Sequence, residues 1–298
     1  MKLRVCGIIF TVKGGFLFYI NDMPEGITSK VRLFADDTIA YLTISSDQDA
    51  RMLQSDLDKL AKWETAWLMA FQPEKCNVLT ITKKRNPIKF NYTLHGHSLE
   101  HVTSAKYLGC TITSDLKWGP HINNICNKAN STIGFLKRNL NIANKSVKER
   151  AYQSLVRPSL EYSSAVWDPH QQQDKQRLER IQRRAARYVT NRYHNTSSVS
   201  DMLDQLEWPS LESRRTNSRL TMMYKMTKNL ANVDTSDKLI PLQKPSRNCN
   251  TLAFSIPSCR TSIRKESFYP RTTKDWNALK DASVGAQSLE AFKACLRQ

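Results

Sequence analysis

The spacing of the hydrophobic residues changes once along the chain, near residue 119. Before that point, β-branched and aromatic residues form short runs separated by turn signals, which is typical of strands. One helical segment starts near Ser46, where Ser46 and Asp49 have the spacing of a capping box. Its predicted apolar side comprises Leu53, Leu57, Leu60 and Leu68, with Glu64 on the same side.

After residue 119 the spacing becomes helical, with prolines between the segments. From about residue 240 the chain is rich in Ser, Pro, Thr and Arg, and it closes with LEAFKACL, a short segment of periodic apolar residues. The pattern predicts an α+β fold in which antiparallel hairpins plus a helix are followed by a mostly helical part. It favours three regions, residues 1–118, 119–194 and 195–298, the last helical with irregular segments.

The charge of the chain is strongly basic and unevenly distributed. Lys and Arg number 45 against 27 Asp and Glu, a net charge of +18. Residues 1–118 carry a net charge of only +3, while residues 119–298 carry +15. Such an excess favours a polyanionic partner, either nucleic acid or an acidic membrane surface, and places the contact in the second part of the chain.

Cysteine usage and hydropathy indicate an intracellular protein. Seven cysteines without a short-range framework are typical of reduced thiols. The N-terminal run imitates a signal peptide, but Lys13 interrupts it and no small-residue cleavage site follows. No uncharged apolar stretch reaches the ~18 residues that span a bilayer. We therefore predict a nuclear or cytoplasmic location without a membrane.

Two adjacent carboxylates, Asp36 and Asp37, stand inside the strand-like run VRLFADDTIAYLTI, residues 31–44. One interpretation is a hairpin whose turn uses Asp, because Asp tolerates turn geometry and keeps a loop soluble. The other is a metal site, because two carboxylates on an apolar platform need a counter-charge that a divalent cation supplies. Metal ions held by Asp oxygens serve phosphoryl transfer in this way. The spacing alone leaves both interpretations open.

Several further segments, read together with the two carboxylates, resemble a known protein family. In chain order they are LFYINDMPEGITSKVRLFADDTIAY, then FQPEKC (71–76), YLGCTI (107–112), LVRPSLEYSSAVWDP with RLERIQRRAARYV, and SFYPRTTKDWNAL (267–279) with LEAFKACL (289–296). In this order they resemble the C-terminal part of the reverse transcriptases of non-LTR retrotransposons, the jockey and LINE-like kind. The similarity runs from the end of the palm through the thumb to the tail.

The resemblance implies an RNA-directed DNA polymerase, a nucleotidyltransferase that uses Mg²⁺ or Mn²⁺ on an RNA template with a DNA primer. Asp36 and Asp37 would then be catalytic and hold the metal, and Lys75 would face the incoming nucleotide. Tyr107, Leu108 and Gly109 would form the primer grip. From the residues alone, Lys75 is more typical of a solvated lysine at a turn, and residues 107–109 fit a strand that enters a bend.

The chain also departs from the family pattern. Family members have fingers and a first palm strand with a third catalytic Asp before this point, whereas 35 residues precede Asp36. TVKGGF replaces a PQG-type loop, Gln72 replaces the usual Asn, and Asp22 does not match the catalytic position. These departures predict a 5′-truncated fragment that is inactive alone. They also predict that both carboxylates lie at the hairpin tip on an open surface, beside an uncovered sheet edge.

A basic helix is expected around residues 174–192. Arg177, Arg180, Arg184 and Arg187 fall within roughly 80° of arc, beside an apolar stripe of Leu178, Ile181, Ala185 and Tyr188. A solvated charged face is the ordinary interpretation of such a stripe, but acidic i,i+4 partners are then expected, and only Asp174 and Glu179 occur here. The pattern favours contact with a phosphate backbone, since guanidinium groups bind phosphate bidentately.

Two functions from different classes follow. The first is an enzyme fragment, the RNA-directed DNA polymerase described above. The alternative is a non-catalytic nucleic-acid-binding remnant that grips duplex through its basic helices while the palm is inert.

Overall fold

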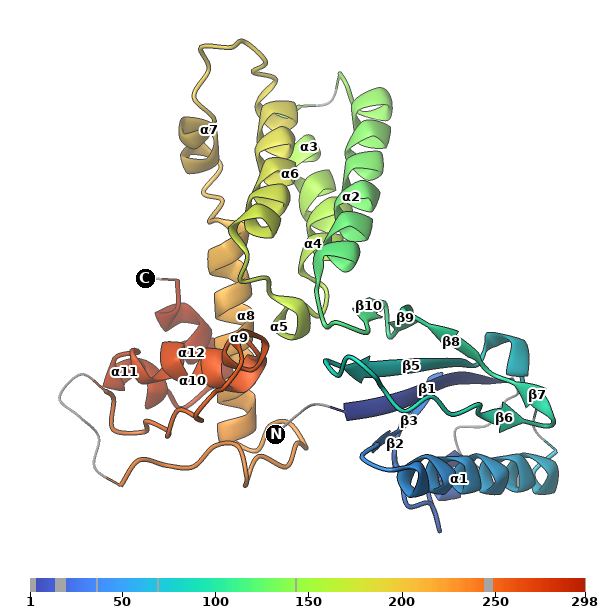
Figure 1. The fold of residues 1–298 in the computed structure, drawn as a ribbon. Coiled ribbons are helices and arrows are strands. Elements are labelled where there is room, and N and C mark those ends of the chain that lie inside the picture. The colour runs from blue at the N-terminus through green and yellow to red at the C-terminus, as the bar shows by residue number, and fades with distance from the viewer. Residues whose placement is uncertain are drawn as a thin grey trace. The chain divides into compact units, whose positions relative to one another are not determined.

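A β-sheet covered by one long helix, and a separate set of helices, make up the structure (Figure 1). It is a computed structural model that describes residues 4–13, 20–35, 37–68, 70–142, 144–243 and 249–297. The chain divides into two units, Met1–His121 and Ile122–Gln298. The α+β class that the sequence predicts is confirmed. The finer division into palm, thumb and C-terminal regions stays a prediction.

The sheet of the first unit has the strand order β2-β3-β1-β5-β8. These strands are β1 (Arg4–Lys13), β2 (Lys30–Phe34), β3 (Asp37–Thr43), β5 (Asn77–Thr82) and β8 (Glu100–Val102). The short β4 (Ala70–Phe71) pairs with the end of β1. Neighbouring strands are antiparallel except β5 and β8, which are parallel.

Strand β1 corrects one prediction. It pairs with β3 from Val5 opposite Thr43 to Thr11 opposite Asp37, and with β5 on its other side. Ile8 and Ile9 of β1 are buried. The expectation of an uncovered edge beside the two carboxylates is therefore wrong, because the apolar N-terminal run that imitates a signal peptide is a central strand of the sheet.

Helix α1 (Asp47–Ala66) packs on one face of the sheet. Leu53, Leu57 and Leu60 are buried against the sheet core, as predicted. Leu68 is a correction, since the helix ends at Ala66 and Leu68, with a positive φ of 52°, is 94% exposed. The carboxylate of Glu64 is buried and accepts a hydrogen bond of 2.5 Å from the backbone N–H of Phe71, so its place on the apolar side has a structural reason.

The predicted capping box of α1 is present. The Ser46 hydroxyl accepts from the Asp49 backbone N–H, and the Asp49 carboxylate accepts from the Ser46 backbone N–H at 2.9 Å. The backbone N–H of Ser45, the backbone N–H of Ser46 and the Ser46 hydroxyl all donate to this carboxylate, and together they lower the pKa of Asp49. We expect Ser46→Ala to lower the free energy of unfolding by about 1 kcal/mol, because the N-terminal amide loses its acceptor.

Urea unfolding measures this effect. Ser45→Ala is the matched control, since only the backbone N–H of Ser45 bonds to Asp49. Equal unfolding midpoints for the two variants would contradict a stabilising role of the cap.

Short elements complete the first unit. They are the 3₁₀ turns η1 (Ile20–Asp22) and η2 (Pro73–Lys75), and the strands β6 (Thr93–Leu94), β7 (His97–Ser98), β9 (Ser104–Tyr107) and β10 (Cys110–Thr113). β9 and β10 form a hairpin in which Tyr107 lies opposite Cys110. Leu108 and Gly109 between them both have positive φ, the geometry that a two-residue hairpin turn requires.

The second unit is helical in its described part. Its helices are α2 (Gly119–Asn139), which begins at the end of the first unit, α3 (Lys145–Ala151), the π-helical η3 (Tyr152–Val156), α4 (Arg157–Glu161), α5 (Ser164–Trp167), α6 (Gln172–Thr190), α7 (Val199–Gln205), α8 (Leu211–Thr227), α9 (Ser262–Lys265), α10 (Phe268–Asn277), α11 (Asp281–Val284) and α12 (Leu289–Cys295). The LEAFKACL run forms α12. Over the described ranges, no helix has the length and apolar character of a membrane span.

A buried charge cluster ties α5, α8 and α10 together. The carboxylate of Asp168, just after α5, accepts from Arg215 at 2.7 Å and from Arg219 at 2.8 Å, and forms an ion pair with Arg271 at 3.2 Å. The side chains of Asp168, Arg215 and Arg219 are almost fully buried. Asp168 of the WDP sequence therefore links the end of α5 to α8 and α10.

Candidate carboxylate site and basic helix surface

The Asp-bearing segment forms a hairpin, as predicted. β2 and β3 are antiparallel, and Phe34 lies directly opposite Asp37. Asp36 lies outside the described residues. Asp37 is the first residue of β3 and is half-buried, so it belongs to the strand, whereas the sequence placed it at the tip. Ala35, which follows β2, has a positive φ of 50°.

Strand alternation puts Asp37 on the face away from α1. Thr38 and Ala40 are fully buried toward the helix side, whereas Asp37, Ile39 and Tyr41 point to the other face. The cross-strand partners on β2 share this face, Phe34 opposite Asp37 and Arg32 opposite Ile39. Phe34 is 63% exposed. Asp37, Arg32 and the exposed ring of Phe34 therefore share one face of the hairpin.

Tyr107 belongs to the same neighbourhood. It packs with Ile39 in a small apolar cluster that contains Ile9 and Leu79. Burial raises the pKa of Tyr107, the charge of Asp37 raises it further, and Arg32 acts in the opposite direction. The fold thus brings together two groups that lie seventy residues apart in sequence, the Asp-bearing strand and the first residue of the predicted primer grip.

The other predicted residues of this site are Lys75, Leu108 and Gly109. Lys75 ends η2 and is exposed, and the structure describes no hydrogen bond or ion pair of its ammonium group. Leu108 and Gly109 form the turn that follows Tyr107. Asp22, which the sequence excluded from catalysis, accepts a hydrogen bond of 2.8 Å from the Trp63 indole.

The Asp37 carboxylate is the described group of the hairpin that could bind a metal ion. A half-buried carboxylate at a strand end is the type of oxygen ligand that Mg²⁺ takes, so Asp37 fits such an ion. Within the described residues there is no group of three or more His, Cys, Asp or Glu side chains that could hold a metal. Asp37 thus has the chemistry of one metal ligand, and the metal role of Asp36 and Asp37 stays a prediction.

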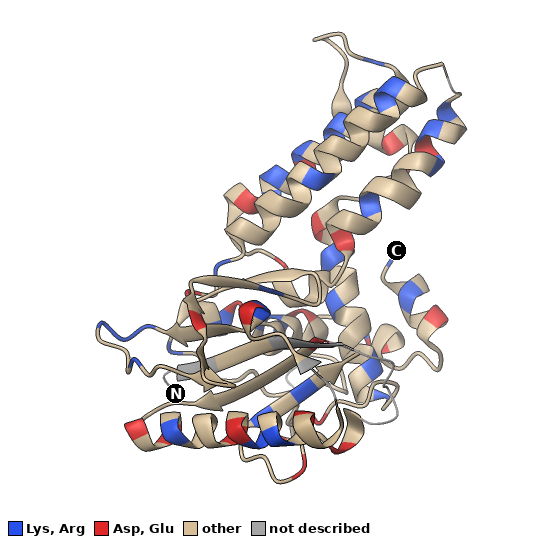
Figure 2. Cartoon of the chain, turned by 90° about the vertical axis from the view of Figure 1, so that its right-hand side faces the viewer, with Lys and Arg blue, Asp and Glu red and all other residues tan. Residues whose placement is uncertain are grey.

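The predicted basic helix is α6, and its apolar stripe of Leu178, Ile181, Ala185 and Tyr188 is buried as expected. The helix packs beside α2 through repeated contacts. Arg177 donates to Asn123 and Arg184 donates to Asn130, both at 2.8 Å. The Tyr188 hydroxyl donates to the Leu136 carbonyl at 3.1 Å. Figure 2 shows basic residues recurring along the long helices of this unit.

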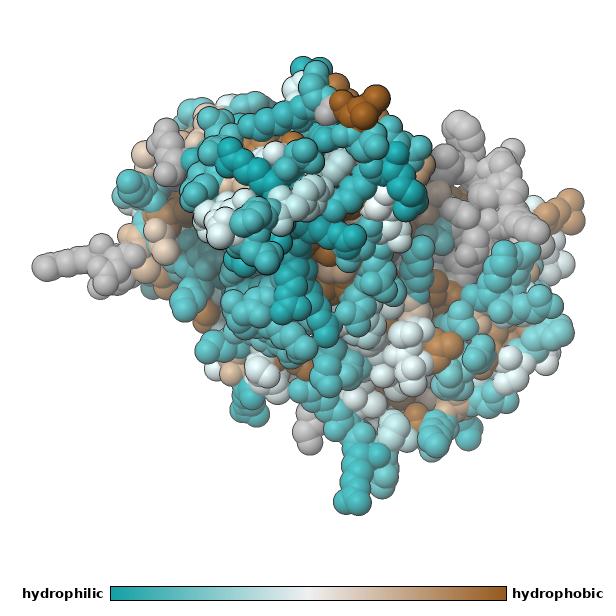
Figure 3. All heavy atoms as spheres, turned by 90° about the horizontal axis from the view of Figure 1, so that it is seen from above, coloured by the Kyte–Doolittle hydropathy of each residue, from teal (hydrophilic) through white to brown (hydrophobic). Residues whose placement is uncertain are grey.

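The four arginines are not equivalent. Arg177 and Arg184 have partners on α2, and Arg177 also pairs with Asp174 at 3.5 Å. Arg180 is exposed, while Arg187 is half-buried. Most of the face seen in Figure 3 is hydrophilic.

A cavity of about 400 Å³ collects several of these cations. Its lining residues are Lys137, Arg180, Arg183, Arg184, Arg187, Tyr193 and Val199. The sequence prediction missed Lys137, Arg183 and Tyr193. Arg183 lies roughly 40° of helical arc beyond Arg187, so a wider arc would have found it. Lys137 and Tyr193 come from other segments, and no local periodicity signals them.

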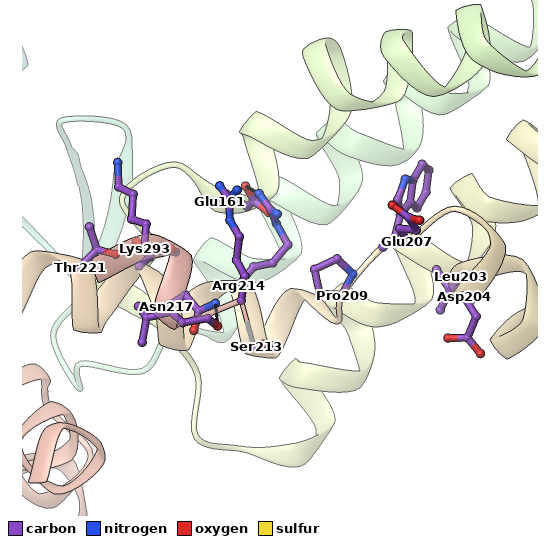
Figure 4. Close-up of a pocket in the computed structure, with 15 residues that line it drawn as sticks. Glu161, Leu203, Asp204, Glu207, Pro209, Ser213, Arg214, Asn217, Thr221 and Lys293 are labelled. Atoms are coloured by element: carbon purple, nitrogen blue, oxygen red, sulfur yellow. Dashed lines mark hydrogen bonds and ion pairs between the residues drawn. The ribbon is translucent and has the colours of Figure 1, made fainter. Parts of the chain in front are cut away.

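A larger cavity of about 1030 Å³ lies elsewhere in the second unit, between the segment that joins α7 to α8 and the C-terminal helix (Figure 4). In it Glu161 and Arg214 point toward one another and form a two-pronged ion pair, with Nη2 to Oε2 at 2.9 Å. This bonding raises the pKa of Arg214. Asp204, Glu207 and Lys293 also line the cavity, so its charge is mixed.

Comparison with known proteins agrees with the sequence resemblance. Three curated proteins of Drosophila melanogaster are similar: a probable RNA-directed DNA polymerase from transposon BS, at 28% identity over 163 residues; the RNA-directed DNA polymerase from mobile element jockey, at 29% over 142 residues; and a probable RNA-directed DNA polymerase from transposon X-element, at 22% over 184 residues. The chain resembles jockey-type retrotransposon polymerases. No protein-family model matches it.

The similarity to jockey-type polymerases covers part of each protein. It spans 53%, 46% and 59% of this chain in the three comparisons. It spans 18%, 15% and 20% of the transposon BS, jockey and X-element proteins respectively, so the chain matches a fifth or less of each relative's length.

Proposed function

We propose that the chain works as part of an RNA-directed DNA polymerase of a non-LTR retrotransposon. Residues 1–118 would supply part of the palm, residues 119–194 a thumb-like helical region that grips the template and primer, and residues 195–298 a C-terminal region. The similarity to three retrotransposon polymerases carries this proposal. This function places the chain inside the cell, in the nucleus or the cytoplasm, where templates and primers occur.

In this proposal Asp36 and Asp37 hold Mg²⁺ or Mn²⁺, which supplies charge stabilisation for phosphoryl transfer. Lys75 faces the incoming nucleotide, and residues 107–109 position the primer end. The nearness of Tyr107 and Asp37 supports this arrangement, because a primer grip must hold the reacting hydroxyl close to the metal-binding carboxylates.

We expect no measurable primer extension from these 298 residues alone. The strand beside Asp37 is β1, and its sequence RVCGIIFTVK contains no carboxylate, so a third metal ligand is missing at that strand. Poorly placed metal ions lose most of their catalytic effect. The measurement is template-dependent incorporation by the purified protein with Mg²⁺ or Mn²⁺. Incorporation that Asp36→Asn abolishes would contradict the expectation.

Metal binding separates the palm proposal from the alternative, a non-catalytic remnant that binds nucleic acid. Titration with Mn²⁺, followed by electron paramagnetic resonance, should show saturable binding that Asp37→Asn weakens at least tenfold. Asp58→Asn, which removes an exposed carboxylate from α1, is the matched control. Equal Mn²⁺ binding in the two variants would exclude the metal role of Asp37 and favour the remnant.

A further inference from the structure

The basic cavity of the second unit is an unusual concentration of like charge. Five of its seven lining residues are Lys or Arg, and none is Asp or Glu. Its volume of about 400 Å³ lies within the range of about 300–1,000 Å³ that is typical of small-ligand sites. The two carboxylates of α6 are occupied elsewhere, since Asp174 pairs with Arg177 and Glu179 accepts from the Glu212 backbone N–H.

Burial is unfavourable for two of the basic groups at the cavity. The Nε of Arg187 is fully buried, and it has no hydrogen-bond partner among the described residues. Burial lowers the pKa of Lys137, and the charge of Arg184 lowers it further. A buried donor without an acceptor lowers the stability of the folded chain, and so does the repulsion between neighbouring positive charges. A bound anion would offset both costs.

The aromatic ring of Tyr193 contacts one of these cations, the ammonium group of Lys137. The Lys137 ammonium lies over the Tyr193 ring, 4.9 Å from its centroid, in a cation–π contact. Lys137 belongs to α2, the arginines belong to α6, and Tyr193 follows α6, so three segments shape the cavity. Tertiary packing therefore brings the cations together, and Lys137 and Arg184 are each fixed further by a contact, with Tyr193 and with Asn130 respectively.

We propose that this cavity binds one phosphate group of a nucleic-acid strand. The planar guanidinium groups of Arg183, Arg184 and Arg187 suit phosphate oxygens, and Lys137 adds a point charge that Tyr193 positions. The proposal takes the identity of the ligand from the proposed nucleic-acid function and deepens it. It distinguishes a fixed phosphate position from the diffuse attraction of the remaining basic surface.

Calorimetric titration with inorganic phosphate tests the site, against chloride at the same ionic strength. We expect saturable binding of one phosphate per chain, weakened at least tenfold by Lys137→Gln and by Arg187→Gln. Lys128→Gln is the control, because it removes one positive charge from an exposed position of α2 that does not line the cavity. Tyr193→Phe should keep binding and Tyr193→Ala should weaken it. Circular dichroism checks folding, and Lys137→Gln still decides the matter if the half-buried Arg187 variant fails to fold.

Anisotropy with a labelled RNA–DNA duplex forms the second arm. Arg187→Gln and Lys137→Gln should each weaken duplex binding and flatten the salt slope by about one unit. No saturation by phosphate, or equal phosphate binding by cavity and control variants, overturns the site. Phosphate binding without any loss of duplex affinity in the cavity variants overturns the nucleic-acid ligand. Failure of Mn²⁺ binding at Asp37, with both arms positive, rejects the polymerase proposal and leaves the phosphate site standing.

Discussion

Asp168→Asn is expected to lower the free energy of unfolding of the second unit by about 3–5 kcal/mol, because removing one partner of a buried ion pair leaves uncompensated charge. Asp168 has a side chain that is 2% exposed, and it is the shared acceptor of Arg215, Arg219 and Arg271. The Arg215 side chain has no exposed surface, so water cannot replace the lost carboxylate.

The geometry explains why a neutral amide does not substitute. Asp168 accepts through both carboxylate oxygens, Oδ1 from Arg215 and Oδ2 from Arg219, while its backbone carbonyl accepts from Arg271 at 2.9 Å. An Asn side chain offers one oxygen and turns an NH₂ toward a guanidinium group. Among the described residues, Nη1 and Nη2 of Arg215 already lack hydrogen-bond partners.

Guanidinium unfolding followed by far-ultraviolet circular dichroism measures the change. Asp275→Asn is the matched control, because Asp275 pairs with the same Arg219 at 2.9 Å but is 34% exposed. Surface ion pairs contribute about 0–1 kcal/mol, so this control should lose little. A loss in Asp168→Asn no larger than in the control would show that the cluster does not hold the helices together.

Replacing Arg180 and Arg184 together with Gln should weaken nucleic-acid binding similarly for all sequences. Each phosphate contact on B-form duplex contributes roughly −0.9 to the slope of log K against log salt, because binding releases counterions. Four contacts from the predicted arginine stripe give a slope near −3.6 by the same rule. The double variant should therefore flatten the slope by about two units.

Anisotropy across a salt series, with a labelled duplex, is the measurement. Lys83→Gln with Arg85→Gln removes the same charge from exposed positions of the first unit, and it should leave the slope nearly unchanged. Arg184 also donates to Asn130, so the folding of the double variant is checked by circular dichroism. An unchanged slope in a folded double variant would mean that the α6 stripe is an ordinary solvated face.

The sequence by itself determined the elements that depend on local spacing. The FADD hairpin, the capping box at Ser46 and the buried stripe of α6 all follow from residues a few positions apart in sequence. Leu68 shows the limit of this approach, since the spacing continued past Ala66, where the helix ends.

Only the tertiary structure decided which distant segments meet. Strand pairing placed β1 beside Asp37, and helix packing gathered three arginines around Asp168 and brought Lys137 and Tyr193 to the arginines of α6. Spacing reports which face of an element is apolar, but not which remote segment covers that face. A buried charge is stabilised by a partner that lies far away in sequence, so its role appears only when the chain is folded.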